Sequence, residues 1–169
     1  IKQISVICSA VTASQDAIDM AIEHHADALL VHHGFFWRGE PSVLTGMKRA
    51  RIAALIKNNI NLIAYHLPLD AHRQYGNNIG LAKELGVINI QSAPAMGQPD
   101  LLWHGEFDPP ISADKLARIF NDKLMRKPLL IQSRKNPISR IAWCTGAAQD
   151  LIEQAYALGV DAFISGEVS

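Results

Sequence analysis

Ala28-Leu29-Leu30-Val31-His32-His33-Gly34 is the stretch of this sequence that most strongly indicates its fold. A continuous Leu/Val run predicts a buried strand, and ligand sites in open α/β sheets lie beyond the carboxyl ends of strands. His32 and His33 are therefore placed to bind metal. Because successive strand residues point to opposite faces, we expect the two rings to serve two neighbouring ions, one ring to each.

Strand and helix patterns alternate along the chain, which predicts an α/β fold with mostly parallel or mixed sheets. Predicted strands cover residues 4–11, 28–31, 60–65, 87–90, 102–107, 129–132, 141–145 and 162–165. Predicted helices cover residues 14–24, 46–57, 77–85, 112–124 and 149–158. Ser14 and Ser112 are expected N-caps, because a hydroxyl accepts from the first free N–H groups of a helix. The Pro/Gly-rich segment 92–99 marks a boundary, so we expect one half at residues 1–92 and a second at residues 93–169.

The two halves contain an internal repeat. A shift of 134 residues aligns segment 7–31 with segment 141–165 without gaps and with eight identities. This predicts a duplicated β-α-β unit and two pseudo-equivalent halves; the alternative is the general similarity of all such units. His25 aligns with Gly159, so we expect it to end a helix in the left-handed conformation common at that position. His32-His33 instead aligns with Gly166-Glu167, at the carboxyl end of the equivalent strand.

A second candidate motif, His66-Leu67-Pro68-Leu69-Asp70, follows the predicted strand 60–65 and contains two polar side chains, His66 and Asp70. Pro68 cannot continue a central strand, so we expect Asp70 to turn toward the same rim as His32 and His33. A carboxylate can bridge two ions, which lie roughly 3.5–4 Å apart in two-metal centres. Such ligands suit Zn, Fe, Mn, Co or Ni rather than Ca or Mg. His66 would orient Asp70 or shuttle a proton; alternatively, His66 is a hydrogen-bonded structural residue and Asp70 a cap.

In combination, several motifs resemble one family, the NGG1-interacting-factor-3-like proteins, also called GTP cyclohydrolase I type 2. The similarity is to the compact, enterobacterial-type members and covers nearly the whole chain. The motifs that carry it are residues 27–37, 46–49, 65–72, 76–78, 141–146 and 159–167. The resemblance implies a dinuclear metal centre between two α/β halves, with His32, His33 and Asp70 among the ligands, and a homohexameric ring. It also implies that a further His and Glu ligand lie beyond Ser169, so that the chain is truncated at both ends.

Three other features have two interpretations each. Glu167 aligns with His33 and would act as a catalytic base or outer ligand, or would cap a helix. The aromatic run Phe35-Phe36-Trp37 would form a wall against a nucleobase, or would serve packing and oligomer contacts. Lys48, Arg49 and Arg51 would steer phosphates, or would form the solvated start of a helix.

The composition excludes some classes of function. Lys+Arg and Asp+Glu both number 16, which argues against a nucleic-acid partner because such binding needs a basic surface. No apolar run approaches the ~20 residues of a membrane-spanning helix. Cys8 and Cys144 lie in apolar runs, which is typical of reduced thiols in a cytoplasmic protein.

These observations together predict a metal-dependent hydrolase with two divalent ions, acting on a nucleotide or a related small molecule. The ions would lower the pKa of a bridging water and supply hydroxide near neutral pH. The alternative is a non-catalytic metal-binding ring that binds partners or metabolites. Nothing in these residues selects guanine.

Overall fold

The computed structural model describes residues 3–133 and 135–168, which divide into two compact units, Ile1–His66 and Leu67–Ser169. The division falls after His66 and not after residue 92. The Pro/Gly-rich segment 92–99 belongs to an antiparallel hairpin in which β4 (Ile88–Ala95) pairs with β5 (Gln98–Ile111). Met96 and Gly97 connect the two strands with positive φ angles of 49° and 76°, as two-residue hairpin turns require. The segment interpreted from the sequence as a boundary therefore lies within a hairpin.

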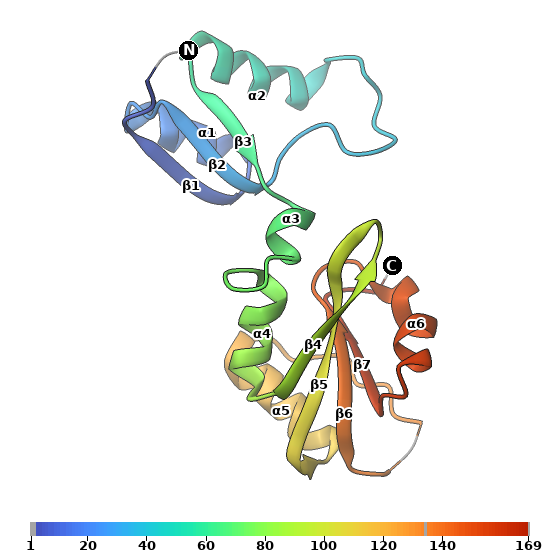
Figure 1. Cartoon of the computed structure of the whole chain (residues 1–169). Coiled ribbons are helices and arrows are strands. Elements are labelled where there is room, and N and C mark those ends of the chain that lie inside the picture. Colours follow the sequence, from blue (N-terminus) through green and yellow to red (C-terminus); the bar gives the residue numbers. More distant parts are fainter. Residues whose placement is uncertain (1–2, 134, 169) are drawn as a thin grey trace. The chain divides into compact units, whose positions relative to one another are not determined.

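The first unit is built on a parallel sheet with the strand order β1-β2-β3 (Figure 1). Its elements are β1 (Ile7–Thr12), α1 (Gln15–Glu23), β2 (Ala28–His33), α2 (Gly46–Lys57) and β3 (Asn61–Ala64). The predicted cap of α1 is confirmed, since Ser14 Oγ accepts from the N–H of Ala17 at 3.1 Å. His25 follows α1 with a φ of 50°, as its alignment with Gly159 (φ 69°) predicted.

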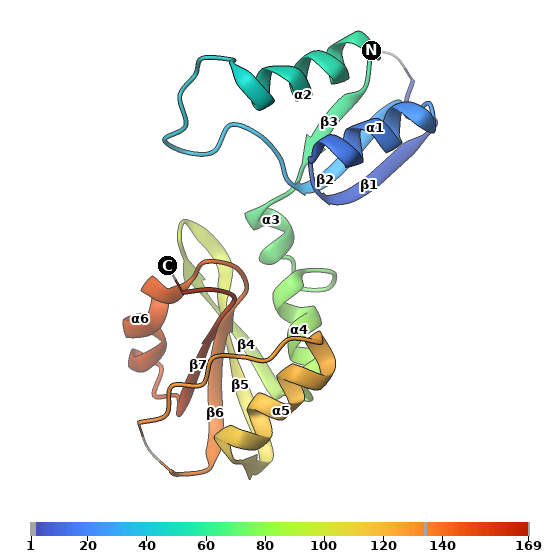
Figure 2. The same ribbon diagram turned by 180° about the vertical axis from the view of Figure 1, so that it is seen from behind.

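The core of this unit lies between the sheet and its two helices. Ile18 of α1, Leu29 of β2 and Leu55 of α2 belong to one buried cluster, and the view from behind shows α1 lying across the strands (Figure 2). In contrast, Ile7 and Val11 of β1 are exposed. This packing fixes β2 as the central strand, so its carboxyl end, with His32 and His33, is flanked on both sides.

The second unit contains a mixed sheet with the order β4-β5-β6-β7, in which only β6 and β7 are parallel. Its other elements are α3 (Leu67–Asp70), α4 (Asn77–Leu85), α5 (Ala113–Leu124), β6 (Ile138–Cys144), η1 (Gln149–Leu151), α6 (Ile152–Ala157) and β7 (Ala162–Ser165). At two places the second unit differs from the elements predicted from the sequence. The short helix α3 was not foreseen, although Pro is favoured in a first helical turn. The predicted strand at residues 129–132 is irregular chain, with Leu129 and Ile131 mostly exposed.

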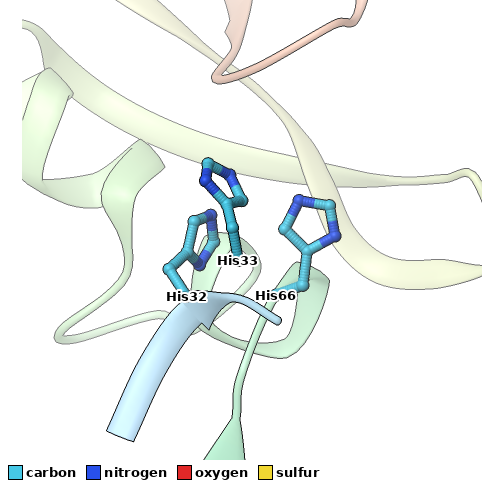
Figure 3. A group of neighbouring side chains, drawn as sticks. All are labelled: His32, His33 and His66. Carbon is cyan, nitrogen blue, oxygen red and sulfur yellow. The ribbon is translucent and has the colours of Figure 1, made fainter. Parts of the chain in front are cut away.

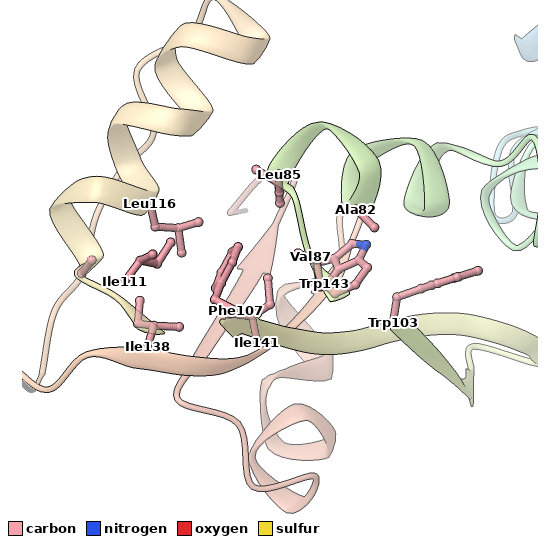
Figure 4. Close-up of a cluster of buried hydrophobic side chains, with 11 residues drawn as sticks. Ala82, Leu85, Val87, Trp103, Phe107, Ile111, Leu116, Ile138, Ile141 and Trp143 are labelled. Atoms are coloured by element: carbon pink, nitrogen blue, oxygen red, sulfur yellow. The ribbon is translucent and has the colours of Figure 1, made fainter. Parts of the chain in front are cut away.

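Strand β6 is buried on both faces of the second sheet. Ile141 and Trp143 belong to the cluster formed with α4 and α5 (Figure 4), whereas Ala142 and Cys144 belong to the cluster formed with α6. The indole Nε1 of Trp143 donates to the carbonyl oxygen of Asn78 at 3.0 Å. A strand that is covered on both sides reads as a continuous apolar run, which is why β6 was recognisable from sequence.

The internal repeat is visible in the strand register. Ile7 pairs with Ala28 between β1 and β2, and Ile141 pairs with Ala162 between β6 and β7, with the same offset at the next three pairs. Both pairs of strands are parallel and each is connected through a helix. The α/β class and the two β-α-β units predicted from sequence are therefore confirmed.

Among the described residues, no helix combines the length and apolarity needed to cross a membrane. Both cysteines are free thiols, Cys8 half-buried in the first unit and Cys144 buried in the second.

Candidate metal centre

Three histidines of the first unit converge at the carboxyl end of its sheet. His32 and His33 are the last residues of β2, and His66 follows β3, which ends at Ala64. One ring nitrogen of each lies within 4.8 Å of the other two, and all three side chains are half-buried. Figure 3 shows the three imidazoles grouped beyond the end of β2. Ligands 2.0–2.1 Å from one Zn²⁺ are at most about 4.2 Å apart, so small ring movements would bring all three nitrogens onto one ion.

The two adjacent histidines do not diverge as strand alternation predicted. Their ring centroids are 4.6 Å apart, and each ring is also close to His66, at 4.9 and 5.3 Å. On the β3 side the pairing of β2 stops at the pair Val31 and Ala64, whereas on the β1 side it continues to the pair Thr12 and His33. At this end of the strand β2 has a partner on one side only, and the two rings lie close to each other and to His66.

Hydrogen bonds fix the orientation of two of the rings. His32 Nδ1 lies 2.8 Å from the carbonyl oxygen of Tyr65, and because a carbonyl can only accept, Nδ1 carries the proton. In the neutral ring Nε2 then keeps its lone pair. His33 Nδ1 contacts the hydroxyl of Thr12 at 3.1 Å. Metal-binding histidines usually have their second nitrogen held in this manner, so both rings are preorganised.

An aromatic side chain borders the cluster. The ring of Trp37 lies 5.0 Å from His66, at an angle of 86°, and 5.8 Å from His33. Trp37 is 44% exposed, so one part of the residue packs on the histidines while another part faces solvent. Of the aromatic run noted in the sequence, Trp37 is thus the residue that contacts the candidate site.

Asp70, the carboxylate predicted to join His32 and His33, belongs to the second unit, where it ends α3 and is 5% exposed. Its Oδ1 accepts from Asn77 Nδ2 at 2.8 Å and from the Thr145 hydroxyl at 3.1 Å. A carboxylate in this position is built into a hydrogen-bond network of its own unit. Its role as a ligand stays a prediction.

That network is completed by Asn78, a residue that sequence reasoning missed. Asn78 is fully buried; its amide nitrogen donates to the carbonyl oxygen of Asp70 at 3.1 Å, and its Oδ1 accepts from the N–H of Thr145 at 2.9 Å. A buried polar side chain must be paired in this way. The available signals were its place in the family motif at residues 76–78 and its position at the start of a helix.

Glu167 lies just after β7 and is exposed. Its carbonyl oxygen accepts from Ser165 Oγ at 2.8 Å. This contact involves the backbone of Glu167 and not its carboxylate. The role of Glu167 as base or outer ligand therefore stays a prediction.

The geometry defines a class of protein: two α/β units with a repeated β-α-β element and a three-histidine candidate metal site at a strand end. The family model for Duf34/NIF3 (NGG1p interacting factor 3) matches residues 1–169. The chain belongs to this family, which confirms the resemblance seen in its motifs.

Curated relatives support the same assignment. The chain is 48% identical over 168 residues to a protein of Pseudomonas aeruginosa, and 46% identical over 171 residues to one of Escherichia coli. Each carries the name "GTP cyclohydrolase 1 type 2 homolog". The alignments cover 99% of this chain and 66% of each relative, so the chain spans about two thirds of their length.

Solved structures agree with the fold. The protein ybgI, described as of unknown function, is 44% identical with a TM-score of 0.89, and the match covers all of this chain and 67% of that one. A protein from Thermus thermophilus, TTHA1606, is 27% identical with a TM-score of 0.78, covering 100% of this chain and 66% of that one.

Proposed function

We propose that the protein is a metal-dependent hydrolase with a dinuclear centre, acting on a nucleotide or a related small molecule. The observation that carries the metal part of this proposal is the cluster of His32, His33 and His66, with ligand nitrogens within 4.8 Å of one another. The second ion is what the family resemblance implies. Imidazole nitrogens suit Zn, Fe, Mn, Co or Ni. We propose that these three histidines would hold the metal. Asp70, which belongs to the second unit, stays a predicted ligand.

The residues present fit such an ion. The Tyr65 carbonyl holds the proton of His32 on Nδ1, 2.8 Å away, which leaves Nε2 as a neutral donor of a lone pair. The hydroxyl of Thr12 holds His33 in the same manner when the ring donates to it. Preorganised rings lose little entropy on binding a metal, because their orientation is already fixed.

Each of the other residues has a task in this proposal. A divalent ion supplies Lewis acidity and brings the pKa of water toward about 7. Trp37 shields one side of His66 from solvent. Glu167 is the proposed proton acceptor, since a carboxylate at a strand end can receive a proton released by water.

The nucleotide part of the proposal is supported by the names of the relatives, which refer to GTP cyclohydrolase. We further propose a homohexameric ring, as the family resemblance implies. Large apolar side chains that stay exposed in one chain, among them Val11, Ile131 and Tyr156, are consistent with contacts between copies. Light scattering on the purified protein measures the assembly directly.

The test compares histidines of the cluster with a histidine outside it. His33→Ala and His66→Ala should each lower the bound metal, measured by elemental analysis, whereas His24→Ala is the matched control because His24 is exposed at the end of α1. The intact protein, loaded with Mn, Zn or Fe, is then assayed for hydrolysis of a nucleotide panel. Asp70→Asn should abolish turnover and leave the oligomer intact.

Absence of turnover with every metal would contradict the hydrolase. If removal of metal then altered the oligomeric state without affecting any reaction, the protein would be the non-catalytic metal-binding ring. Equal metal content in His24→Ala and His33→Ala would contradict the assignment of the cluster itself.

A further inference from the structure

We propose that the cavity beside the histidine cluster is an anion subsite in which Arg51 binds a phosphate group of the substrate. The inference rests on the proposed function and narrows its substrate class to phosphorylated nucleosides. The cavity lies wholly within the first unit and has a volume of about 240 Å³. Its lining includes Thr12, His33, Trp37, Met47, Lys48 and Arg51.

Two cationic side chains line the cavity, but only one is available for a ligand. Lys48 Nζ donates to Glu40 Oε2 at 2.7 Å and also lies 4.5 Å from the centre of the Phe36 ring. Glu40 lines the same cavity, so the two charges offset each other locally. Arg51 is half-buried, and its Nε is a buried donor with no hydrogen-bond partner among the described residues.

A buried donor without a partner is unfavourable, because it has lost its hydrogen bond to water and has no other acceptor. Arg51 lines the cavity, so an anion bound there would offer its guanidinium group an acceptor. The guanidinium presents several N–H groups in a planar fork that matches the oxygens of a phosphate, and such charge-assisted bonds are stronger than neutral ones. The cation is therefore more than the solvated start of a helix.

The cavity connects this cation to the candidate metal centre. Thr12 and His33, which contact each other at 3.1 Å, both line it. Trp37 also lines it and packs at 5.0 Å on His66. A ligand with its phosphate at Arg51 would thus have its next atoms beside the histidines. Typical small-molecule sites measure about 300–1,000 Å³, so the cavity would hold only part of a nucleotide, and the partly exposed indole offers a face for the base.

Binding measurements on the intact, metal-loaded protein test the subsite. Calorimetric titrations use GTP, guanosine and inorganic phosphate. Arg51→Gln should weaken GTP binding by ~10-fold or more, the size expected for losing a hydrogen bond to a charged group, and should leave guanosine binding unchanged. Arg49→Gln is the matched control, because Arg49 is exposed on the same helix, does not line the cavity, and its substitution removes the same charge.

Equal GTP affinity in Arg51→Gln and Arg49→Gln would overturn the subsite. Inorganic phosphate that binds as tightly as GTP would overturn the nucleoside part of the assignment. Arg51→Lys keeps the charge and loses the planar fork, so it decides the question if the Gln variant fails to fold; a GTP affinity equal to that of the unaltered protein would then count against the proposal.

The two proposals fail in different measurements. The hydrolase fails if no metal gives turnover, whatever the affinity of Arg51→Gln. The subsite fails on equal affinities, even if metal-dependent hydrolysis is observed. Metal content, measured on each variant, shows whether Arg51→Gln acts on the cavity and not on the histidines.

Discussion

Asp27 and Asp161 make the same pair of hydrogen bonds in the two units. Oδ2 of Asp27 accepts from the backbone N–H groups of residues 5 and 6, at 2.9 and 3.1 Å. Oδ2 of Asp161 accepts from those of residues 139 and 140, both at 2.9 Å. The partners differ by the same offset of 134 residues as the aspartates do. Each carboxylate therefore ties the start of the second strand of a β-α-β unit to the start of the first, and fixes the register of the pair.

We expect Asp27→Ala to lower the free energy of unfolding by about 1–2 kcal/mol, because two backbone donors lose a charged acceptor. Asp27→Asn should cost less, since an amide oxygen still accepts. Asp161 is more exposed, so Asp161→Ala should cost less than Asp27→Ala. Urea unfolding measures these differences, with exposed Glu23→Ala as the control for loss of a carboxylate. If Glu23→Ala lowered the free energy of unfolding as much as Asp27→Ala, the loss could not be assigned to the two hydrogen bonds of Asp27.

Thr12 should influence metal binding without being a ligand. Thr12→Val keeps the shape of the side chain and removes the hydroxyl that contacts His33 Nδ1 at 3.1 Å. Loss of such an outer contact typically lowers metal affinity by ~10–100-fold. Competition with a chromogenic chelator measures the affinity. Thr45→Val is the matched control, because the Thr45 side chain makes no capping hydrogen bond at the start of α2. Equal affinities of the two variants would show that the hydroxyl does not support the ring.

Features that depend on neighbouring residues were predictable from the sequence. Ser14 caps α1 through its hydroxyl, Gly86 ends α4 with a φ of 70°, and His25 takes the left-handed conformation that its alignment with Gly159 required. In each case one side chain, or its absence, determines the local backbone. The strand register also followed, since the offset of the repeat is preserved in the pairing.

Features that depend on distant residues were not predictable in the same way. The run at residues 129–132 is apolar enough for a strand, but no strand forms there and the segment stays largely exposed. Propensity alone does not provide a neighbouring strand.

The site was predicted only in part, for the same reason. The carboxyl end of β2 does bring His32 and His33 to a histidine cluster. The expectation that each ring serves a different ion stays a prediction. His66 was assigned as a helper of Asp70, whereas the structure brings it to the other two rings. Its place depends on how the chain leaves β3: the N–H of Tyr65 still donates to the carbonyl oxygen of Val31, and the direction of the chain after that bond is not given by the sequence.

Cys144 should be the less reactive of the two thiols. Burial, and then the negative charge of Asp70, raise the pKa of Cys144 to about 11. Because the thiolate is the reactive form, roughly one molecule in a thousand would carry it at pH 8. Iodoacetamide at pH 8 should label Cys8 first, as followed by mass spectrometry on Cys8→Ser and Cys144→Ser. Asp70→Asn should speed labelling of Cys144, because it removes the second cause. Faster labelling of Cys144 than of Cys8 in the unaltered protein would contradict this account.

Asp100 should contribute to stability against acid. Arg73 Nε and a terminal guanidinium nitrogen donate to its two oxygens at 3.0 and 2.7 Å, and the Ser92 hydroxyl donates at 2.6 Å. Arg73 first, and then Ser92, lower the pKa of Asp100 from 3.8 to about 2. A carboxyl whose pKa is lower in the folded state stabilises the protein above its unfolded pKa, and this contribution is lost as the pH falls through the folded value.

Arg73→Gln should therefore raise the pKa of Asp100 toward 3.8, as measured by NMR titration of its carboxyl carbon. The variant should be less stable than the unaltered protein above about pH 4, and the difference should vanish near pH 2. Lys123→Gln is the control, because it breaks an exposed ion pair with Glu84, 3.3 Å long, that leaves both side chains more than half exposed. Exposed pairs contribute little, so the control should follow the unaltered protein across this range. A stability difference for Arg73→Gln that persists unchanged to pH 2 would mean that its arginine acts through packing and not through the charge of Asp100.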